Sequence, residues 1–234
     1  MSPQYQLLLV EHDPNYLPIL VRLLERHGYR VRSTRSGLDA LRDLERRTPD
    51  LMLLDINLPD INGLDLLHRI RTLSNVPIVV LSAQTDERGK VRSLEAGADD
   101  FITKPFHDAE LLARIGALMR RVSWTPTSDP LLEVGGLRVD IARRYVTLNS
   151  RPLHLTPIEY AILCTMMQRV GQIVTHEELL HSVWGPGYGG DYSVLRVNIS
   201  RLRQKIEENP RRPTCILTIP RQGYKMPEEV GHGA

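Results

Sequence analysis

The sequence is poor in cysteine and contains no long hydrophobic run. Its two cysteines, Cys164 and Cys215, are too few for a disulfide framework, and they lie among apolar neighbours, so we expect reduced thiols in the core. No segment has the roughly 18 consecutive apolar residues of a membrane-spanning helix. The N-terminus, MSPQYQLLLV, lacks the basic region of a secretory signal. These absences predict a soluble, cytoplasmic protein with no membrane partner.

Lysine is also scarce, since only Lys90, Lys104, Lys205 and Lys225 are lysines among the 30 basic residues. The net charge of +2 excludes a histone-like polycation and an acidic disordered chain. The charge is nevertheless uneven. The first 121 residues contain 17 basic and 17 acidic residues, whereas residues 196–225 contain eight basic and two acidic ones, a net of +6. Such a cluster is typical of binding to a nucleic-acid backbone, and a solvated basic helix is the alternative.

The first half alternates strand and helix patterns. Short apolar runs that suit buried strands occur at 7–10, 29–33, 51–54, 76–81 and 101–103. Amphipathic helix patterns lie between and after them, near 14–27, 36–46, 62–72, 86–96 and 108–121, and Asp13-Pro14 is typical of a helix start. Five such units predict an α/β domain over residues 1–121, a doubly wound five-stranded parallel sheet with helices on both faces.

The second half has a different order of elements. Residues 122–132 are rich in Pro, Ser, Thr and Asp and predict a linker. Strand-like pieces follow at 133–153, then three helix patterns beginning near residues 156, 175 and 191, and finally a hairpin over 216–226. The first of these helices begins with a capping box, Thr156-Pro157-Ile158-Glu159. This order predicts a winged-helix domain over 133–227 and a short tail at 228–234.

Polar side chains follow the strands of the first half at the point where each strand ends. Asp55 follows the run 51–54, and Glu11 and Asp13 follow the run 7–10. Ser82 and Lys104 follow the last two runs in the same way. Because the carboxyl ends of parallel strands converge, we expect these groups to lie together. Repulsion between the carboxylates calls for a cation, and Mg²⁺ suits oxygen ligands and phosphoryl chemistry, with Asp55 as the nucleophile. Ordinary loop caps and turns are the alternative.

These residues belong to motifs that identify a family. The first half contains LLDINLPD at 53–60, LSA at 81–83, GADDF at 97–101 and KPF at 104–106. The second half contains LTPIEY at 155–160, Trp184, RLRQK at 201–205 and Gly223-Tyr224. Over nearly its whole length, the chain resembles response regulators of the OmpR/PhoB class: a receiver domain joined to a winged-helix DNA-binding domain. The runs HLTPIE and WGP look most like the potassium-transport (KdpE-type) regulators.

The resemblance implies a role for each residue of the acid cluster. Asp55 would accept the phosphoryl group, Lys104 would contact the acyl phosphate, and Ser82 would donate a hydrogen bond to a phosphoryl oxygen. Ala83 would leave room for that oxygen, and Phe101 would be the aromatic that turns inward when Ser82 moves. Glu11, Asp55 and the carbonyl group of Asn57 would hold Mg²⁺.

One position departs from the family pattern. The family has two adjacent acids after the first strand, and the second of them binds Mg²⁺ directly, whereas this chain has Glu11-His12. Imidazole is a poor Mg²⁺ ligand and favours transition metals. Asp13 is also expected to cap a helix. We therefore expect weak Mg²⁺ binding and slow or absent phosphorylation; the alternative is that Glu11, Asp55 and waters suffice.

The resemblance also places a dimer interface on the receiver. The family dimerises through its fourth helix, fifth strand and fifth helix. The residues at the usual ion-pair positions are Lys90, Asp99, Asp100, Glu110 and Arg114. Lys90 with Glu110, and Asp100 with Arg114, are the expected pairs, and an ordinary charged helix surface is the alternative.

In the winged helix, the resemblance implies that the third helix enters the major groove of double-stranded DNA. Arg196, Ser200 and Arg201 are the candidates for contact with base edges. The candidates for phosphate contact or helix support are Asn198, Arg203 and Lys205, and Arg221 is the candidate for the minor groove. Residues 184–191 (WGPGYGGD) correspond to the family's contact region for RNA polymerase, and a passive glycine-rich turn is the alternative.

Three hypotheses about function follow. The first is a sequence-specific transcription regulator that dimerises when a sensor histidine kinase phosphorylates Asp55. The second is an atypical receiver that dimerises and binds DNA without phosphate, because His12 replaces an acid. The third, an aspartate-nucleophile phosphatase, requires an acid two residues after Asp55, where this chain has Asn57, and it leaves the basic winged helix without a role.

Overall fold

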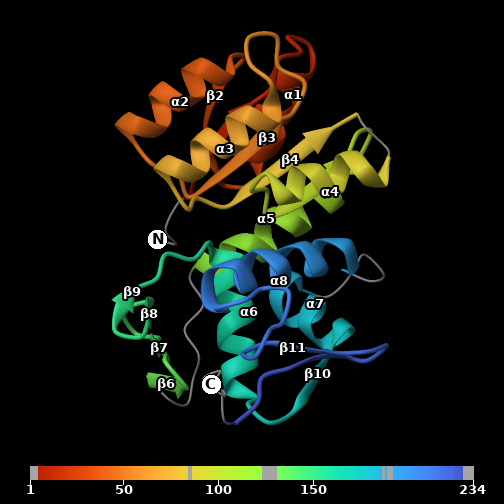
Figure 1. Cartoon of the computed structure of the whole chain (residues 1–234). Coiled ribbons are helices and arrows are strands. Elements are labelled where there is room, and N and C mark those ends of the chain that lie inside the picture. The colour runs from red at the N-terminus through yellow and green to blue at the C-terminus, as the bar shows by residue number, and fades with distance from the viewer. Residues whose placement is uncertain (1–4, 84–85, 123–130, 186–187, 189–191, 229–234) are drawn as a thin grey trace. The chain divides into compact units, whose positions relative to one another are not determined.

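The computed structural model describes residues 5–83, 86–122, 131–185, 188 and 192–228 (Figure 1). The chain divides into two compact units, residues 1–122 and 123–234. Among the described residues, no helix is long and apolar enough to cross a membrane.

The first unit is a five-stranded parallel sheet with the strand order β2-β1-β3-β4-β5. Its strands are β1 (Gln6–Val10), β2 (Arg30–Thr34), β3 (Leu51–Asp55), β4 (Ile78–Ser82) and β5 (Asp100–Thr103). Its helices are α1 (Tyr16–Arg26), α2 (Gly37–Arg46), α3 (Gly63–Leu73), α4 (Glu87–Glu95) and α5 (Asp108–Val122). With right-handed crossovers, this order puts helices on both faces, which confirms the doubly wound sheet.

The apolar runs of the sequence become the strands of this core. Every residue of β3 and of β4 is buried, as expected of central strands that helices cover on both sides. Helix starts follow from capping side chains: Ser36, Asn62 and Asp86 accept hydrogen bonds from the backbone in the first turns of α2, α3 and α4. Because the strands are parallel, their carboxyl ends all lie at one edge of the sheet, where the polar residues that follow them gather.

The loop between β3 and α3 is held close to the end of β3. A Cβ atom on Gly63 would lie 2.3 Å from the carbonyl oxygen of Ile56, so only glycine permits this approach. Asp60, in the same loop, accepts hydrogen bonds from the backbone N–H groups of Gly37 and Leu38 at 3.0 Å and thereby caps α2. Although burial acts to raise its pKa, these hydrogen bonds and one from Ser36 lower the pKa of Asp60. The loop is thus fixed at both ends beside Asp55.

The second unit begins with a four-stranded antiparallel sheet in the order β6-β7-β8-β9. These strands are β6 (Leu131–Val134), β7 (Leu137–Asp140), β8 (Tyr145–Leu148) and β9 (Arg151–Pro152). The helices are α6 (Pro157–Gln168), α7 (His176–Trp184) and α8 (Tyr192–Ile206). A second sheet, in the order β10-β12-β11, contains β10 (Ile173–Thr175), β11 (Leu217–Ile219) and β12 (Gly223–Lys225). This arrangement confirms the winged helix.

Two boundaries differ from the sequence prediction. Helix α5 runs to Val122 and β6 begins at Leu131, so both ends of the predicted linker 122–132 belong to regular structure. The rest of that linker, 123–130, lies outside the described residues, as do 186–187 and 189–191 of the predicted polymerase-contact segment and 229–234 of the predicted tail.

The wing has a third strand that the sequence did not indicate. β10 pairs with β12, and a Cβ atom on Gly223 would lie 2.1 Å from the carbonyl oxygen of Val174 across that pair. Glycine is therefore required at the start of β12. The two cysteines are buried and free, as predicted, and burial raises the pKa of each thiol to about 11.

Candidate functional site

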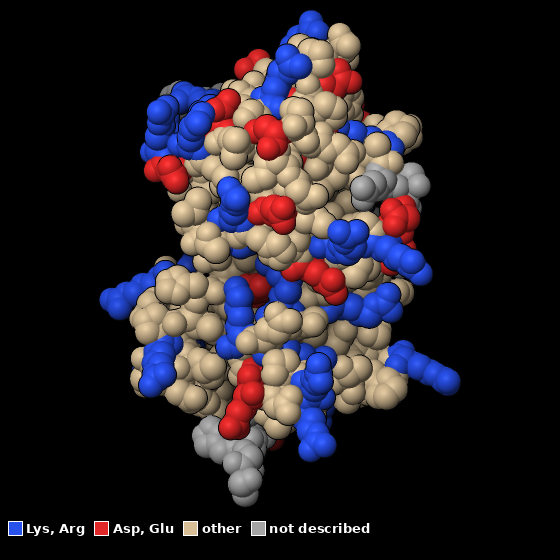
Figure 2. Space-filling model, turned by 45° about the horizontal axis from the view of Figure 1, so that its top comes forward, with Lys and Arg blue, Asp and Glu red and all other residues tan. Residues whose placement is uncertain are grey.

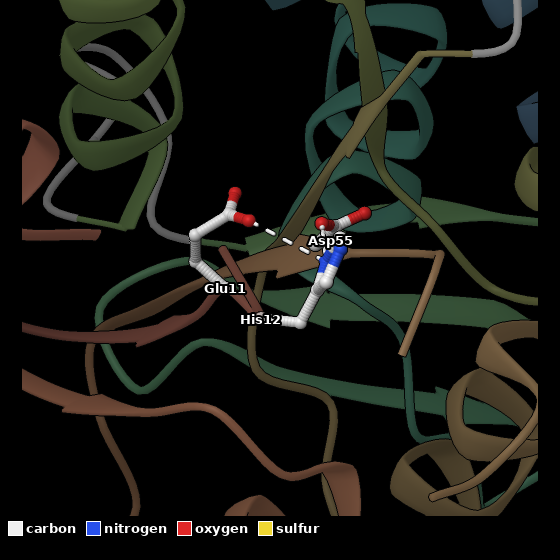
Figure 3. A group of neighbouring side chains, drawn as sticks. All are labelled: Glu11, His12 and Asp55. Atoms are coloured by element: carbon white, nitrogen blue, oxygen red, sulfur yellow. Dashed lines mark hydrogen bonds and ion pairs between the residues drawn. The ribbon is translucent and has the colours of Figure 1, made fainter. Parts of the chain in front are cut away.

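The acid cluster predicted from the strand ends forms at the carboxyl edge of the receiver sheet. Glu11 and His12 follow β1, Asp55 ends β3, and Lys104 follows β5. Figure 3 shows the His12 ring lying between the two carboxylates. The side chains of Glu11 and Asp55 are 0% and 1% exposed, whereas that of His12 is 43% exposed. The cluster is therefore a buried acid pair with an imidazole at its open side.

Asp55 has a partner on each carboxylate oxygen. Its Oδ1 accepts a hydrogen bond from the Asn57 backbone N–H at 2.9 Å. Its Oδ2 lies 3.1 Å from Nζ of Lys104 and 2.7 Å from Nδ1 of His12. Burial is the largest single influence and acts to raise the pKa of Asp55, but the Asn57 N–H and the charge of Lys104 outweigh it and lower the pKa. Asp55 is thus held as a carboxylate.

Glu11 shares the same lysine. Its Oε2 accepts a hydrogen bond from Lys104 at 2.6 Å, and its Oε1 accepts one from the Asp13 backbone N–H at 3.0 Å. Burial nevertheless raises the pKa of Glu11, and the neighbouring charge of Asp55 adds to the rise. Two carboxylates with one ammonium form a site with excess negative charge.

The donors of this cluster do not fit Mg²⁺ well. The ligand atoms that face one another are two carboxylate oxygens and Nδ1 of His12, which lies 3.6 Å from Oε1 of Glu11. Mg²⁺ requires near-octahedral oxygen coordination, and imidazole suits transition metals better. Asp13 does not replace the missing acid, because its Oδ1 accepts hydrogen bonds from the N–H groups of Asn15 and Tyr16 at the start of α1.

The predicted switch residues lie along the same edge. Ser82 ends β4 and is fully buried, and its carbonyl oxygen accepts a hydrogen bond from the backbone N–H of Lys104 at 2.7 Å. Ala83, the next residue, is exposed. Phe101 is 4% exposed on β5, so in this structure its ring is inside the receiver. The inward ring is the arrangement that the family resemblance assigns to the switched state.

Most of the predicted dimer residues are paired within the receiver itself. Arg114 contacts Oδ1 of Asp100 at 3.2 Å and Oε1 of Glu110 at 2.8 Å. Lys90 is half-buried on α4. Asp99 requires a correction: it is 0% exposed, binds Arg71 at 2.6 Å and accepts a hydrogen bond from the Ile78 N–H. Because its carboxylate faces the interior, we reassign Asp99 from the dimer surface to the link between α3 and the sheet.

In the winged helix, a buried glutamate holds two of the predicted DNA-binding residues. Glu159 of α6 is 0% exposed and lies 2.7 Å from Nζ of Lys205 and 3.4 Å from Nη2 of Arg201. Both cations belong to α8, so these ion pairs fix α8 on α6. Of the two roles expected for Asn198, phosphate contact or helix support, the structure leaves the second, because Asn198 is fully buried and donates a hydrogen bond to the Val194 carbonyl at 2.9 Å.

The remaining predicted DNA-binding residues divide into two groups. Arg203 donates a hydrogen bond to the Ile216 carbonyl at 3.0 Å and another to Oγ1 of Thr218 at 2.9 Å, and so joins α8 to the wing. Arg196 and Ser200 are exposed and lie four residues apart on one side of α8. Arg221 is exposed at the tip of the wing hairpin, where it adopts a positive φ of 64°. Figure 2 shows basic and acidic side chains interspersed on the face that it draws.

Comparisons with known proteins agree with this architecture. Residues 7–116 match the response regulator receiver domain, and residues 150–226 match the transcriptional regulatory protein, C-terminal family. The chain is 38% identical to the transcriptional regulatory protein KdpE of Mycobacterium tuberculosis, with 94% of this chain and 97% of that protein covered. It is 37% identical, with the same coverage, to the DNA-binding response regulator MtrA of Mycolicibacterium paratuberculosis.

The chain belongs to the OmpR/PhoB family of response regulators. It is a DNA-binding transcription regulator of the two-component type, in a family of transcription factors rather than enzymes, and the phosphatase hypothesis is set aside. The nearly equal identities with KdpE and MtrA do not single out a potassium-transport regulator.

Solved structures support the assignment to the OmpR/PhoB family. A mutant of RitR has a TM-score of 0.78 and 28% identity, with 96% of this chain and 99% of that chain covered. DrrB, a Thermotoga maritima OmpR/PhoB homologue, has a TM-score of 0.52 and 30% identity, with 96% and 100% covered.

Proposed function

We propose that this regulator is controlled by phosphorylation of Asp55, at a site where Mg²⁺ binds weakly. The supporting observation is a buried carboxylate held in its charged form, with its Oδ2 3.1 Å from the ammonium of Lys104. A charged carboxylate is the form that attacks phosphorus. In the transfer from a sensor histidine kinase, an oxygen of Asp55 bonds to phosphorus while the phosphorus–nitrogen bond to the donor histidine breaks.

The surroundings of Asp55 are suited to the product as well. A phosphoryl group adds about 1.5 to 2 negative charges, which require a nearby cation. Lys104 is the cation in place, and the Ser82 hydroxyl is the candidate donor for a phosphoryl oxygen, with Ala83 leaving space beside it. Access to Asp55 is restricted, however, because His12 and Lys104 contact Oδ2 and the side chain is only 1% exposed. Phosphorylation is therefore slow in our proposal, since His12 must first move away.

The signal reaches DNA through dimerisation. We assign the dimer interface to the surface of α4, β5 and α5, with Lys90, Glu110 and Arg114 as the charged residues that re-pair between two copies. Asp100 is 0% exposed and holds Arg114 from within the receiver. Surface pairs contribute only about 0–1 kcal/mol each, so they set the alignment of the two subunits more than their affinity. Dimers on tandem half-sites, recruitment of RNA polymerase and action in the cytoplasm complete the proposal.

In the DNA complex, we propose that some residues of α8 contact bases and that others position the helix. Arg196, Ser200 and Arg201 are the candidates for base edges, and of these the first two have exposed side chains. Lys205 and Arg203 position the helix and contribute positive charge near the phosphates, and Arg221 extends from the wing towards the minor groove. Among the arginines of α8, Arg196 is therefore the one expected to contribute sequence preference without a structural role.

Substitution of Asp55 by asparagine tests the proposed control. Asparagine keeps the shape of the side chain but does not accept a phosphoryl group. We expect D55N to abolish both phosphate uptake and the response of a reporter gene in cells. Asp65→Asn is the matched control, because Asp65 is an exposed aspartate on α3 of the same domain. If D55N regulates the reporter as the natural chain does, the receiver works without phosphate, which is the alternative hypothesis.

Substitution of Arg196 by alanine tests the DNA assignment. A bidentate arginine–guanine contact contributes about 1–3 kcal/mol of discrimination, so we expect affinity for a preferred duplex to fall by roughly 5- to 150-fold. The duplex is first selected with the natural chain from a random pool, and binding is measured by fluorescence anisotropy. Arg138→Ala removes the same charge from an exposed position of β7 and serves as the control. Equal affinities of both variants would remove Arg196 from the reading surface.

A further inference from the structure

The mismatch between the acid cluster and Mg²⁺ identifies a different ligand. We propose that Glu11, His12 and Asp55 form a site for a divalent transition metal of the Zn²⁺ and Co²⁺ class. Within the described ranges, this is the place where three potential metal-ligating side chains converge, with one ligand atom from each residue within 4.8 Å of the others. Figure 3 shows all three directed towards a common point.

The two separations that involve His12 are compatible with a four-coordinate metal site. With metal–ligand bonds of about 2.0–2.1 Å in a tetrahedral site, neighbouring ligand atoms lie about 3.3 Å apart. Nδ1 of His12 is 3.6 Å from Oε1 of Glu11, close to that separation. Nδ1 is 2.7 Å from Oδ2 of Asp55, where the two atoms share a hydrogen bond. Replacing this bond by two metal–ligand bonds requires the two atoms to separate by about 0.6 Å. The His12 side chain is partly exposed and can shift by this distance.

The chemistry of the donor atoms explains why the site would prefer a transition metal to Mg²⁺. Imidazole nitrogen binds Zn²⁺, Co²⁺, Ni²⁺ and Cu²⁺ well, whereas Mg²⁺ depends on charged oxygen ligands. An imidazole stands where the family has a carboxylate, so the cluster has one negatively charged ligand fewer beside Glu11, Asp55 and Lys104. The loss of charge weakens binding of Mg²⁺, while the nitrogen donor compensates for a transition metal.

The site meets a groove at His12, with the buried carboxylates of Glu11 and Asp55 behind the ring. A groove of about 600 Å³ is lined by His12 and by residues 56–63, the loop that follows Asp55. On the buried side, Lys104 binds Oε2 of Glu11 and leaves Oε1 facing His12. Three protein ligands with water in the remaining position match this arrangement, as in open zinc sites.

Cobalt titration of the untagged full-length chain tests the site directly. Co²⁺ serves as the probe because tetrahedral nitrogen–oxygen coordination gives a visible absorption band. We expect one Co²⁺ per chain, displaced by an equimolar addition of Zn²⁺ and retained in a hundredfold excess of Mg²⁺. His12→Ala is expected to weaken Co²⁺ binding about tenfold or more. His68→Ala removes an exposed imidazole from α3 and is expected to change nothing.

Two results would overturn the site: retention of the absorption band in His12→Ala, or its equal loss in His68→Ala. Displacement of Co²⁺ by Mg²⁺ at similar concentration would overturn the proposed preference for transition metals over Mg²⁺. The inference uses the same cluster as the proposed function, but the two fail separately. A chain that takes up phosphate on Asp55 and binds no Co²⁺ refutes only the metal site. A chain that binds Co²⁺ while D55N regulates normally refutes only the control by phosphate.

Discussion

Replacing His12 by aspartate is expected to tighten Mg²⁺ binding by about tenfold or more and to accelerate phosphorylation of Asp55. The substitution restores two adjacent acids after β1 and removes the imidazole that lies 2.7 Å from Oδ2 of Asp55. The new carboxylate supplies the oxygen donor that Mg²⁺ prefers, and its charge strengthens the attraction of the cluster for the ion. Mg²⁺ affinity is measured by isothermal calorimetry, and phosphorylation by the rate at which acetyl phosphate labels the chain.

His68→Asp is the matched control, because it makes the same replacement at an exposed position of α3 in the same domain. Its Mg²⁺ affinity and labelling rate are expected to equal those of the natural chain. Were His12→Asp to leave both quantities unchanged, water molecules would already be completing the Mg²⁺ shell, and the histidine would not impair the site. Faster labelling without tighter Mg²⁺ binding would assign the effect to access alone.

The sequence predicted the fold and the membership of the acid cluster because both follow from local signals. Each polar residue of the cluster comes directly after a buried run, and parallel strands bring their carboxyl ends to one edge. The departure at His12 was also visible as a residue type out of place. The distances within the cluster were not predictable, since the sharing of Lys104 by Glu11 and Asp55 depends on side chains that are 93 and 49 residues from it.

The predictions that needed correction depend on contacts over long sequence separations or on a misread side of a helix. Asp99 was assigned to the dimer surface because it stands at one of the family's usual ion-pair positions, but its partner in this structure, Arg71, lies 28 residues away in the interior of the receiver. Asn198 was placed among the polar residues of α8. A signal was available there, because Asn198 lies four residues from both Val194 and Leu202, which are buried. Helical spacing would therefore have placed it on the buried side.

The ion pairs of Glu159 are the clearest case of a contact that no sequence pattern indicates. LTPIEY predicted a capping box, and the structure confirms that Thr156 and Glu159 cap α6 reciprocally. The same carboxylate, fully buried, also binds Lys205 and Arg201, which lie 46 and 42 positions later in the sequence. Glu159 therefore links the start of α6 to the helix that is proposed to read DNA.

Glu159→Gln is expected to destabilise the winged helix by about 3 kcal/mol and to lower its melting temperature by about 10 °C or more. Glutamine preserves the capping geometry but withdraws the charge that compensates Lys205 and Arg201, whose side chains are 32% and 12% exposed. Urea denaturation followed by tryptophan fluorescence measures the change, because Trp184 is buried in the same domain. DNA affinity is expected to fall as well, since α8 loses its attachment to α6.

Glu178→Gln provides a control with the same local motif. Thr175 and Glu178 form a second capping box at the start of α7, but the Glu178 side chain is 47% exposed and its ion pair with Arg169 lies at the surface. Exposed pairs contribute about 0–1 kcal/mol, so this variant is expected to lose no more than that. Comparable losses in the two variants would mean that the buried ion pairs of Glu159 contribute no more than the surface pair of Glu178. A loss confined to Glu159→Gln would show that the buried charge holds α8 in place.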